Sequence, residues 1–164
     1  MPPETATIRE ARKEEREAIF PLLLLAEPSA GALRWSLKNL SDAAYVTEDG
    51  GRLVAAATVR FRREPCEIVE LGVARELQGL GYGRRLVGWL VEEARRRGKR
   101  EVFVGTRSTS ASNLIFYQKC GFRVDGVRAD YFWYYDEPVY ENGLLVRDMI
   151  VLRCALDEDP SAPG

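Results

Sequence analysis

The sequence of 164 residues contains no histidine. This absence excludes Ser-His and Cys-His nucleophile pairs, histidine-containing metal sites and a histidine general base. Cysteine is scarce too. The three that occur, Cys66, Cys120 and Cys154, are widely spaced and odd in number, which is typical of neither a disulfide framework nor a cysteine-rich zinc site. We therefore expect no metal site, and any proton transfer must use Glu, Asp, Tyr, Cys or Lys.

The chain also lacks an excess of charge and a long apolar run. Its net charge is -1, so no overall basic field would attract a nucleic acid, and we expect no nucleic-acid partner. The longest apolar run, residues 19–26, is too short to span a membrane and contains Pro21. Acidic residues occupy the N-terminal stretch where a secretory leader would be cationic and then apolar. These features predict a cytoplasmic protein that does not enter a membrane.

Length and composition indicate one globular domain. Hydrophobic residues make up 46% of the chain and charged residues 30%, and 164 residues suffice for a sizeable core. We place the domain at residues 1–156. Residues 157–164 hold two prolines and three acids, and we expect them to form a disordered tail.

The hydrophobic pattern predicts alternating strands and helices rather than repeats. Strands are expected at Thr7 to Ala11, Tyr45 to Glu48, Leu53 to Arg62, Cys66 to Ala74, Glu101 to Gly105 and Phe122 to Asp125, with a last strand or strand pair at Leu144 to Leu156. Helices are expected at Lys13 to Ala26, Ala30 to Leu40, Gly83 to Gly98 and Ser110 to Cys120. The order strand, glycine turn, helix, strand, helix, strand favours an α/β fold with a mixed sheet.

Residues 78–84, Gln-Gly-Leu-Gly-Tyr-Gly-Arg, lie between a predicted strand and a basic amphipathic helix. The first turn of a helix has backbone N–H groups without intrahelical partners and a partial positive charge, and glycines let an anion approach them closely. Arg84 and Arg85 at this end are unfavourable for the helix itself and favour an anion nearby. A tight turn with no ligand is the competing interpretation.

Three motifs taken together resemble the GNAT superfamily of acyl-CoA N-acyltransferases. They are Glu-Ile-Val-Glu-Leu-Gly-Val at 67–73, Gln-x-x-Gly-x-Gly at 78–83, and Asn113-Leu-Ile-Phe-Tyr117 followed by Gly121-Phe122. The resemblance covers roughly residues 5–156. It implies a single GNAT-like domain, α/β (α+β) in class, with flanking helices and a mixed, mostly antiparallel sheet splayed at a β-bulge.

The resemblance also implies acetyl-CoA as the acyl donor. The turn would bind the pyrophosphate of coenzyme A, and the backbone of the preceding strand would pair with the pantetheine arm. Asn113 or Ser110 would contact the coenzyme as well, although the family's commoner asparagine position, seven residues before the tyrosine, is Ser110 here. The positions implied to bind the cofactor are Leu71, Gly72, Val73, Gln78, Gly79, Leu80, Gly81, Tyr82, Gly83, Arg84, Ser110, Asn113 and Tyr117.

Acetyl transfer to an amine needs a base for the ammonium and an acid for the leaving thiolate. Glu70 and Glu67 are the candidate bases. They lie three residues apart on one strand and so on opposite faces, and at most one can point into the cleft. We favour Glu70 narrowly, while an exposed or ion-paired strand carboxylate is the competing interpretation. The resemblance makes Tyr117 the candidate acid; a core tyrosine is the alternative.

The acceptor is less readable from the sequence. The aromatic loop, defined as residues 130–141, combines neighbouring aromatic rings with Asp130, Asp136, Glu137 and Glu141, which could surround a cationic amine. A dimer contact or simple packing is the alternative, so a homodimer stays open. The expected function is N-acetylation of a primary amine of a small molecule or peptide, and the ending faintly resembles ribosomal-protein alanine acetyltransferases. The alternative function is a non-catalytic CoA-binding regulatory module.

Overall fold

The structure is a computed structural model that describes residues 4–156. The tail predicted at residues 157–164 lies outside this range. The chain forms two compact units, residues 1–62 with 68–90 and residues 63–67 with 91–164. No helix within residues 4–156 is long and apolar enough to cross a membrane.

The first unit is built on four neighbouring strands in the order β1-β2-β3-β4. Their bounds are β1 Thr7–Glu10, β2 Ala43–Asp49, β3 Arg52–Arg60 and β4 Cys66–Val73. The hairpin predicted around residues 49–51 joins β2 to β3, which pair antiparallel. Gly50 and Gly51 have φ of +58° and +78°, values that suit glycine and give a turn matching the twist of the strands.

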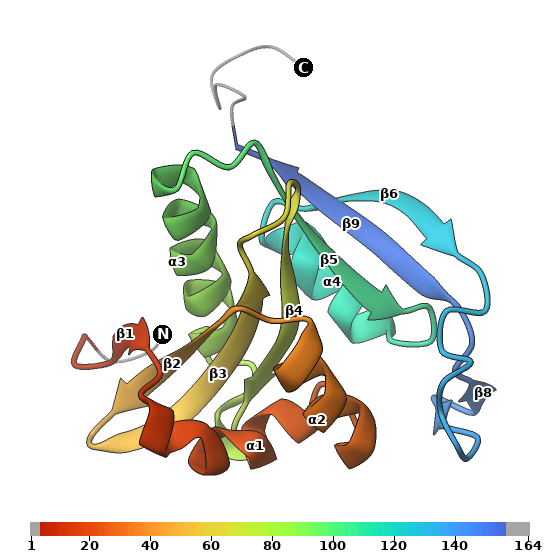
Figure 1. Ribbon diagram of the computed structural model, residues 1–164, viewed down its shortest axis with the longest axis horizontal. Coiled ribbons are helices and arrows are strands. Elements are labelled where there is room, and N and C mark those ends of the chain that lie inside the picture. Colours follow the sequence, from red (N-terminus) through yellow and green to blue (C-terminus); the bar gives the residue numbers. More distant parts are fainter. Residues whose placement is uncertain (1–3, 157–164) are drawn as a thin grey trace. The chain divides into compact units, whose positions relative to one another are not determined.

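Helices cover both faces of these strands (Figure 1). α1 (Arg16–Leu24) and α2 (Ala30–Asn39) bury Ile19, Leu23 and Leu33 against Val46 and Ala56. α3 (Tyr82–Arg96) brings the ring of Trp89 to 5.1 Å from that of its neighbour on β2, Tyr45. Tyr45 and Val46 are adjacent on β2 and so point to opposite faces of the sheet. The pair α1 and α2 therefore packs on one side of β2, and α3 packs on the other.

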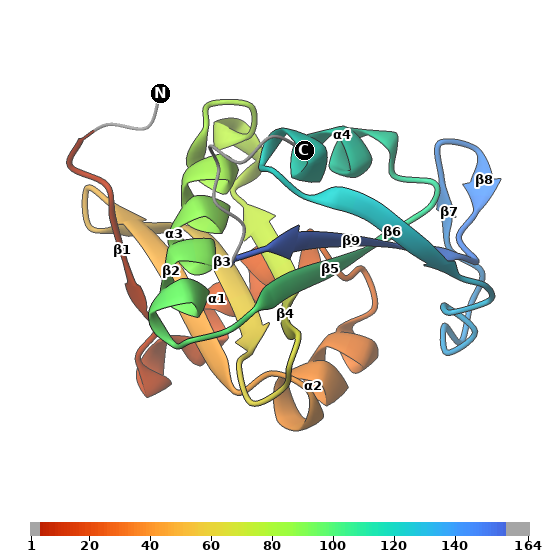
Figure 2. The ribbon, with the colours of Figure 1, turned by 90° about the horizontal axis from the view of Figure 1, so that it is seen from above.

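The second unit contains three strands side by side, in the order β5-β9-β6 (Figure 2). β9 (Met149–Ala155) pairs antiparallel with both β5 (Glu101–Arg107) and β6 (Arg123–Arg128). α4 (Ala111–Lys119) precedes β6. Buried Phe103, Met149 and Val151 form a core on which Tyr131 and Phe132 of the aromatic loop pack.

The elements expected from the sequence are present, with two differences. The helix expected from Lys13 begins as a short 3-10 turn, Lys13–Glu15, and α1 ends at Leu24. The segment after β6 includes a two-residue strand, β7 (Tyr140–Glu141), paired with β8 (Leu144–Leu145). Of the two alternatives expected at Leu144 to Leu156, the structure forms the strand pair, β8 and β9, with residues 146–148 between them. The β-bulge expected near residues 71–73 stays a prediction; irregular register occurs at Thr47/Glu48 in β2.

Candidate active site

The glycine turn connects β4 to α3 through a short 3-10 helix, Arg75–Leu77. Gly79 and Gly81 have φ of +78° and +95°, a region that side chains disfavour, which explains glycine at both positions. Arg85 N donates to Gly81 O at 3.0 Å and begins the hydrogen-bond ladder of α3. The N–H groups of residues 81–84 precede that ladder and have no intrahelical acceptor. The turn therefore has the geometry of an anion-binding helix start.

Two side chains of the turn hold it in place. Gln78 Nε2 donates to Val73 O at 3.0 Å, which ties the turn back to the end of β4. Tyr82 is 5% exposed, and its hydroxyl donates to Asp49 Oδ2 at 2.6 Å. The structure thus uses these side chains to brace the backbone. The backbone N–H of Gln78 is also engaged, because it donates to Arg75 O at 3.4 Å, so a contact of this pair with a bound anion would come from the N–H of Tyr82.

The strand before the turn has a crowded face. Gly72 is buried, and a Cβ built there would lie 1.9 Å from the backbone oxygen of Leu22 in α1. Only glycine allows this close approach of helix and strand. Leu71 and Val73, on the other face of β4, are half-buried. The pairing of residues 71–73 with pantetheine stays a prediction.

Glu70 lies on the buried face of β4, with 7% of its surface exposed. Ser36 Oγ, from α2, donates to Glu70 Oε1 at 2.5 Å, and Thr58 Oγ1, from β3, donates to Oε2. Burial raises the pKa of the Glu70 carboxyl above its ordinary value, the two hydroxyls oppose that rise, and the charge of Glu27 adds to it. The result is a buried carboxylate with raised basicity and two fixed donors.

Glu67, the other candidate base, is half-buried and lies on the opposite face of β4 from Glu70. The burial of successive residues along β4 alternates, which confirms that the two glutamates point to different sides of the strand.

Tyr117 is in α4 and is 9% exposed. Its ring makes edge contacts with Phe116 and Phe122, at centroid distances of 5.0 and 5.8 Å. Burial raises the pKa of the Tyr117 phenol above its ordinary value, and the charge of Cys120 adds to the rise. The phenol therefore keeps its proton through the physiological pH range, as a proton donor must before it acts.

The sequence and the fold are similar to those of known proteins. The sequence model of the acetyltransferase (GNAT) family matches residues 6–122. The uncharacterized N-acetyltransferase YvbK of Bacillus subtilis strain 168 is 34% identical over 145 residues, which cover 87% of this chain and 92% of that protein. The chain belongs to the GNAT acetyltransferase family.

Solved structures agree with this assignment. A GNAT acetyltransferase from Elizabethkingia anophelis with acetyl-CoA bound is similar at a TM-score of 0.86 and 29% identity, over 94% of this chain and 100% of that one. An IAA acetyltransferase from Bacillus cereus ATCC 14579 is similar at a TM-score of 0.81 and 36% identity, over 92% of this chain and 99% of that one. The expected α/β fold and the expected enzyme class, an acetyl-CoA-dependent N-acetyltransferase, are confirmed. A non-catalytic module is not favoured.

The remaining predicted coenzyme residues of this GNAT protein lie at the start of α4. Ser110 is the residue before the helix, is 2% exposed, and accepts the first helical hydrogen bond from Leu114 N at 3.1 Å. Asn113 is exposed. Their contacts with coenzyme A stay predictions.

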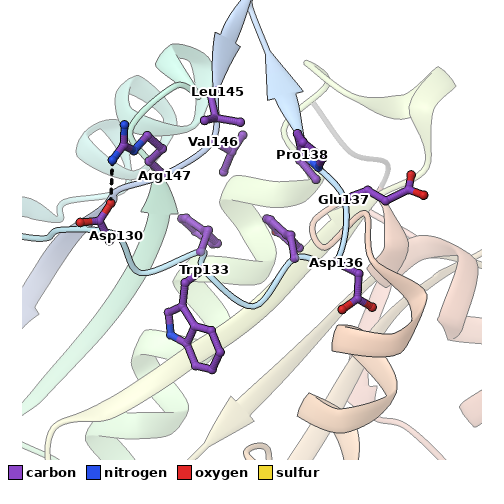
Figure 3. A pocket seen from close by; sticks show the side chains of 11 residues that line it. Asp130, Trp133, Asp136, Glu137, Pro138, Leu145, Val146 and Arg147 are labelled. Carbon is purple, nitrogen blue, oxygen red and sulfur yellow. Dashed lines mark hydrogen bonds and ion pairs between the residues drawn. The ribbon is translucent and has the colours of Figure 1, made fainter.

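The aromatic loop of this GNAT protein lines a cavity of about 420 Å³ (Figure 3). Phe132 and Tyr135 stack there with centroids 5.6 Å apart. Three of the four carboxylates expected to surround an amine line this cavity. These are Asp130, Asp136 and Glu137, and Asp130 pairs there with Arg147 at 3.1 Å. The cavity wall therefore combines aromatic and aliphatic side chains with three carboxylates and one guanidinium.

Glu141, the fourth acid of the loop, is engaged elsewhere in the GNAT domain. Arg107 Nε donates to its Oε1 at 3.2 Å, and Thr109 Oγ1 donates to the same oxygen at 2.8 Å. Asn142 Nδ2 donates to Thr109 O at 2.9 Å. These bonds fasten the β7–β8 hairpin to the end of β5.

The sequence did not lead us to predict Ser36 and Thr58 as residues of the site. Ser36 follows Leu33 by three residues and precedes Leu37 and Leu40, so it occupies a position of the apolar face of α2. Thr58 is a hydroxyl within the buried run of β3. A polar side chain on an apolar face requires a buried partner, which was the available signal. Within residues 4–156, no group of three His, Cys, Asp or Glu side chains gathers as a metal site.

Proposed function

We propose that this GNAT acetyltransferase transfers the acetyl group of acetyl-CoA to a primary amine of a small molecule or a peptide, with direct attack of the amine on the thioester. Glu70 is the general base. The observation that carries the proposal is the buried Glu70 carboxylate, whose pKa is raised by burial and whose two oxygens each accept a hydroxyl. A cytoplasmic location remains part of the prediction.

The glycine turn supplies the donor site in this proposal. The N–H groups of residues 81–84 would bind the pyrophosphate, supported by their place at the start of α3 and by exposed Arg84. Gln78 and Tyr82 brace that backbone through Val73 and Asp49, so the turn is held in shape before a ligand arrives. The residues present fit a phosphate group.

The chemistry follows from the protonation states of two side chains. Glu70 accepts a proton from the ammonium of the acceptor, and the nitrogen lone pair then forms the C–N bond as the C–S bond breaks. The phenol of Tyr117 gives its proton to the leaving sulfur. The nitrogen, positively charged once the C–N bond has formed, releases its second proton as the neutral amide is produced, and this proton restores the phenol of Tyr117. Burial raises the pKa of Tyr117, which keeps the phenol protonated but makes it a weaker acid. The role of Tyr117 is supported by its match to the family's tyrosine position and not by the shift of its pKa.

A thiol-release assay with acetyl-CoA and a panel of primary amines tests the proposal. The panel includes peptides with free N-termini and amines that carry an aromatic ring, because aromatic side chains line the cavity of residues 130–147. We expect thiol release that depends on the amine and on the enzyme. Calorimetric titration with acetyl-CoA runs in parallel. Binding without release across the whole panel would contradict the catalytic proposal, and no binding at millimolar acetyl-CoA would contradict the donor site.

A further inference from the structure

Three buried polar side chains from three elements meet in the first unit. Ser36 of α2 is 6% exposed, Thr58 of β3 is 0% exposed and Glu70 of β4 is 7% exposed. Ser36 and Glu70 are 34 residues apart in sequence, and Thr58 and Glu70 are 12 apart. The surroundings of this polar cluster are apolar, with Leu33 and Ala56 buried on the same elements. The cluster is a specific arrangement that the packing of α2 on the sheet creates.

The two hydrogen bonds of Thr58 fix the orientation of its hydroxyl group. Its oxygen accepts from Glu70 N at 3.1 Å, and its own hydrogen goes to Glu70 Oε2. Ser36 donates to the other oxygen, Oε1. Each carboxylate oxygen has two lone pairs, so each keeps one that neither hydroxyl uses. The two hydroxyls thus fix the plane of the carboxylate and leave it able to accept a proton.

A buried polar cluster of this kind makes the folded protein less stable than an apolar cluster of the same volume would. A buried carboxylate loses its hydration, and an apolar group of similar shape would avoid that loss. Two hydroxyl donors recover part of it by favouring the charged form, because a hydrogen bond to a carboxylate is stronger than one to a neutral acid. The donors therefore act on the ionised state, which is the state that a general base needs.

The charged residues near Glu70 do not stabilise its ionised form in place of the two hydroxyl donors. Glu27, in the connection between α1 and α2, repels the Glu70 charge. Arg34 and Lys38 on α2 are exposed, and Arg34 stacks over the ring of Phe20 at 4.5 Å. Glu67 lies on the other face of β4. Among residues 4–156, support for the Glu70 carboxylate comes from hydroxyls and not from a cation in direct contact.

We propose that Ser36 and Thr58 are positioning residues that hold the Glu70 carboxylate in its proton-accepting orientation. This inference rests on the proposed role of Glu70 as the base. Neither hydroxyl needs to touch the substrate, and both act through Glu70.

The test is the pH dependence of kcat/KM, measured for S36A and T58V with an amine that the wild-type enzyme acetylates. Loss of a donor to the carboxylate raises the pKa of Glu70, so the acidic limb of the profile should move to higher pH by about 0.5 to 1 unit. On that limb kcat/KM should fall about 3- to 10-fold. T58S keeps the hydroxyl, so the acidic limb of its pH profile should lie at the same pH as that of the wild-type enzyme.

T47V is the matched control. Thr47 is another buried threonine, 1% exposed, and within residues 4–156 its Oγ1 has no hydrogen-bond partner. This variant should leave the profile in place. Thermal unfolding and acetyl-CoA affinity, measured on every variant, separate loss of fold from loss of positioning.

The outcomes distinguish the inference from the proposed function. If E70Q is as active as the wild-type enzyme, Glu70 is not the base, and the positioning inference fails together with this role while acetyl transfer itself stands. If E70Q is inactive while S36A and T58V keep the wild-type limb, the positioning inference alone fails. Should T58V not fold, the limb of S36A decides between these results.

Discussion

Glu70 and Tyr117 are both buried titratable groups, and burial raises the pKa of each, yet their surroundings differ. Hydroxyl groups of Ser36 and Thr58 donate to both oxygens of Glu70. The described ring neighbours of Tyr117 are Phe116 and Phe122. Donors favour the charged form of a carboxyl group, whereas aromatic rings offer nothing to a phenolate. The difference suits the two for opposite tasks, Glu70 for taking up a proton and Tyr117 for holding one until it is needed.

The largest effect should follow from E70Q, which removes the proton acceptor and keeps the size of the side chain. General base catalysis typically contributes about 100- to 10,000-fold, and we expect kcat/KM to fall within that range. The thiol-release assay measures it. E67Q is the control on the same strand, and a large loss in E67Q with an active E70Q would assign the base to Glu67 instead.

Y117F should have the next largest effect. The phenyl ring preserves the contacts with Phe116 and Phe122, so the fold should be kept while the donated proton is lost. We expect kcat to fall by about 10- to 100-fold, with a smaller change in KM. An unchanged kcat under conditions where chemistry limits the rate would remove Tyr117 from the mechanism.

The stability of E70Q should depend on pH in a way that reports the raised pKa of Glu70. Because the folded-state pKa is above the unfolded value, the folded protein keeps this proton to higher pH than the unfolded chain does. The stability from this proton is fully present below the unfolded pKa and is lost as pH rises through the folded pKa. The glutamine of E70Q does not titrate, so the variant does not lose this stability as pH rises.

The melting temperature of E70Q relative to wild type should therefore increase with pH, by about 3–5 °C between acidic and alkaline buffers. Thermal unfolding followed by circular dichroism provides the values. A difference that is constant with pH would mean that the pKa of Glu70 is the same in the folded and unfolded states.

T47V should have the smallest effect and should stabilise the protein. Thr47 buries a hydroxyl oxygen that has no partner within residues 4–156, and valine has the same shape without the polar atom. We expect an increase of about 1–3 °C in melting temperature. T58V should do the reverse, since it deprives both Glu70 N and the carboxylate of a partner. Equal effects of the two substitutions would contradict the distinction between a paired and an unpaired hydroxyl.

Features that depend on local backbone chemistry could be predicted from the sequence. Gly79 and Gly81 occur where positive φ is required, and the alternation of β4 places Glu67 and Glu70 on different faces. Both follow from the dihedral preferences of a few neighbouring residues. The same holds for the hairpin at Gly50 and Gly51.

Contacts between distant segments could not be predicted in the same way. The serine on the apolar face of α2 signals a buried partner, but which partner depends on how α2 packs on the sheet. The engagement of Glu141 by Arg107 also joins residues far apart in sequence, and it removes that acid from the set expected to face an amine. The aromatic loop has no period of two or 3.6 residues. The β7–β8 hairpin that follows was missed although the sequence signals it, because Asn142-Gly143, with φ of +53° and +76°, is the turn typical of a two-residue hairpin.

The central claim is that Glu70 removes a proton from the acceptor amine. The most direct measurement is the ratio of kcat/KM for wild type to that for E70Q as a function of pH, with one amine. As pH rises toward the pKa of the amine, more of it is already neutral and the base matters less, so the account predicts a ratio that is large near neutral pH and declines in alkaline buffer. A ratio that stays constant across that range would contradict the assignment of Glu70 as the base.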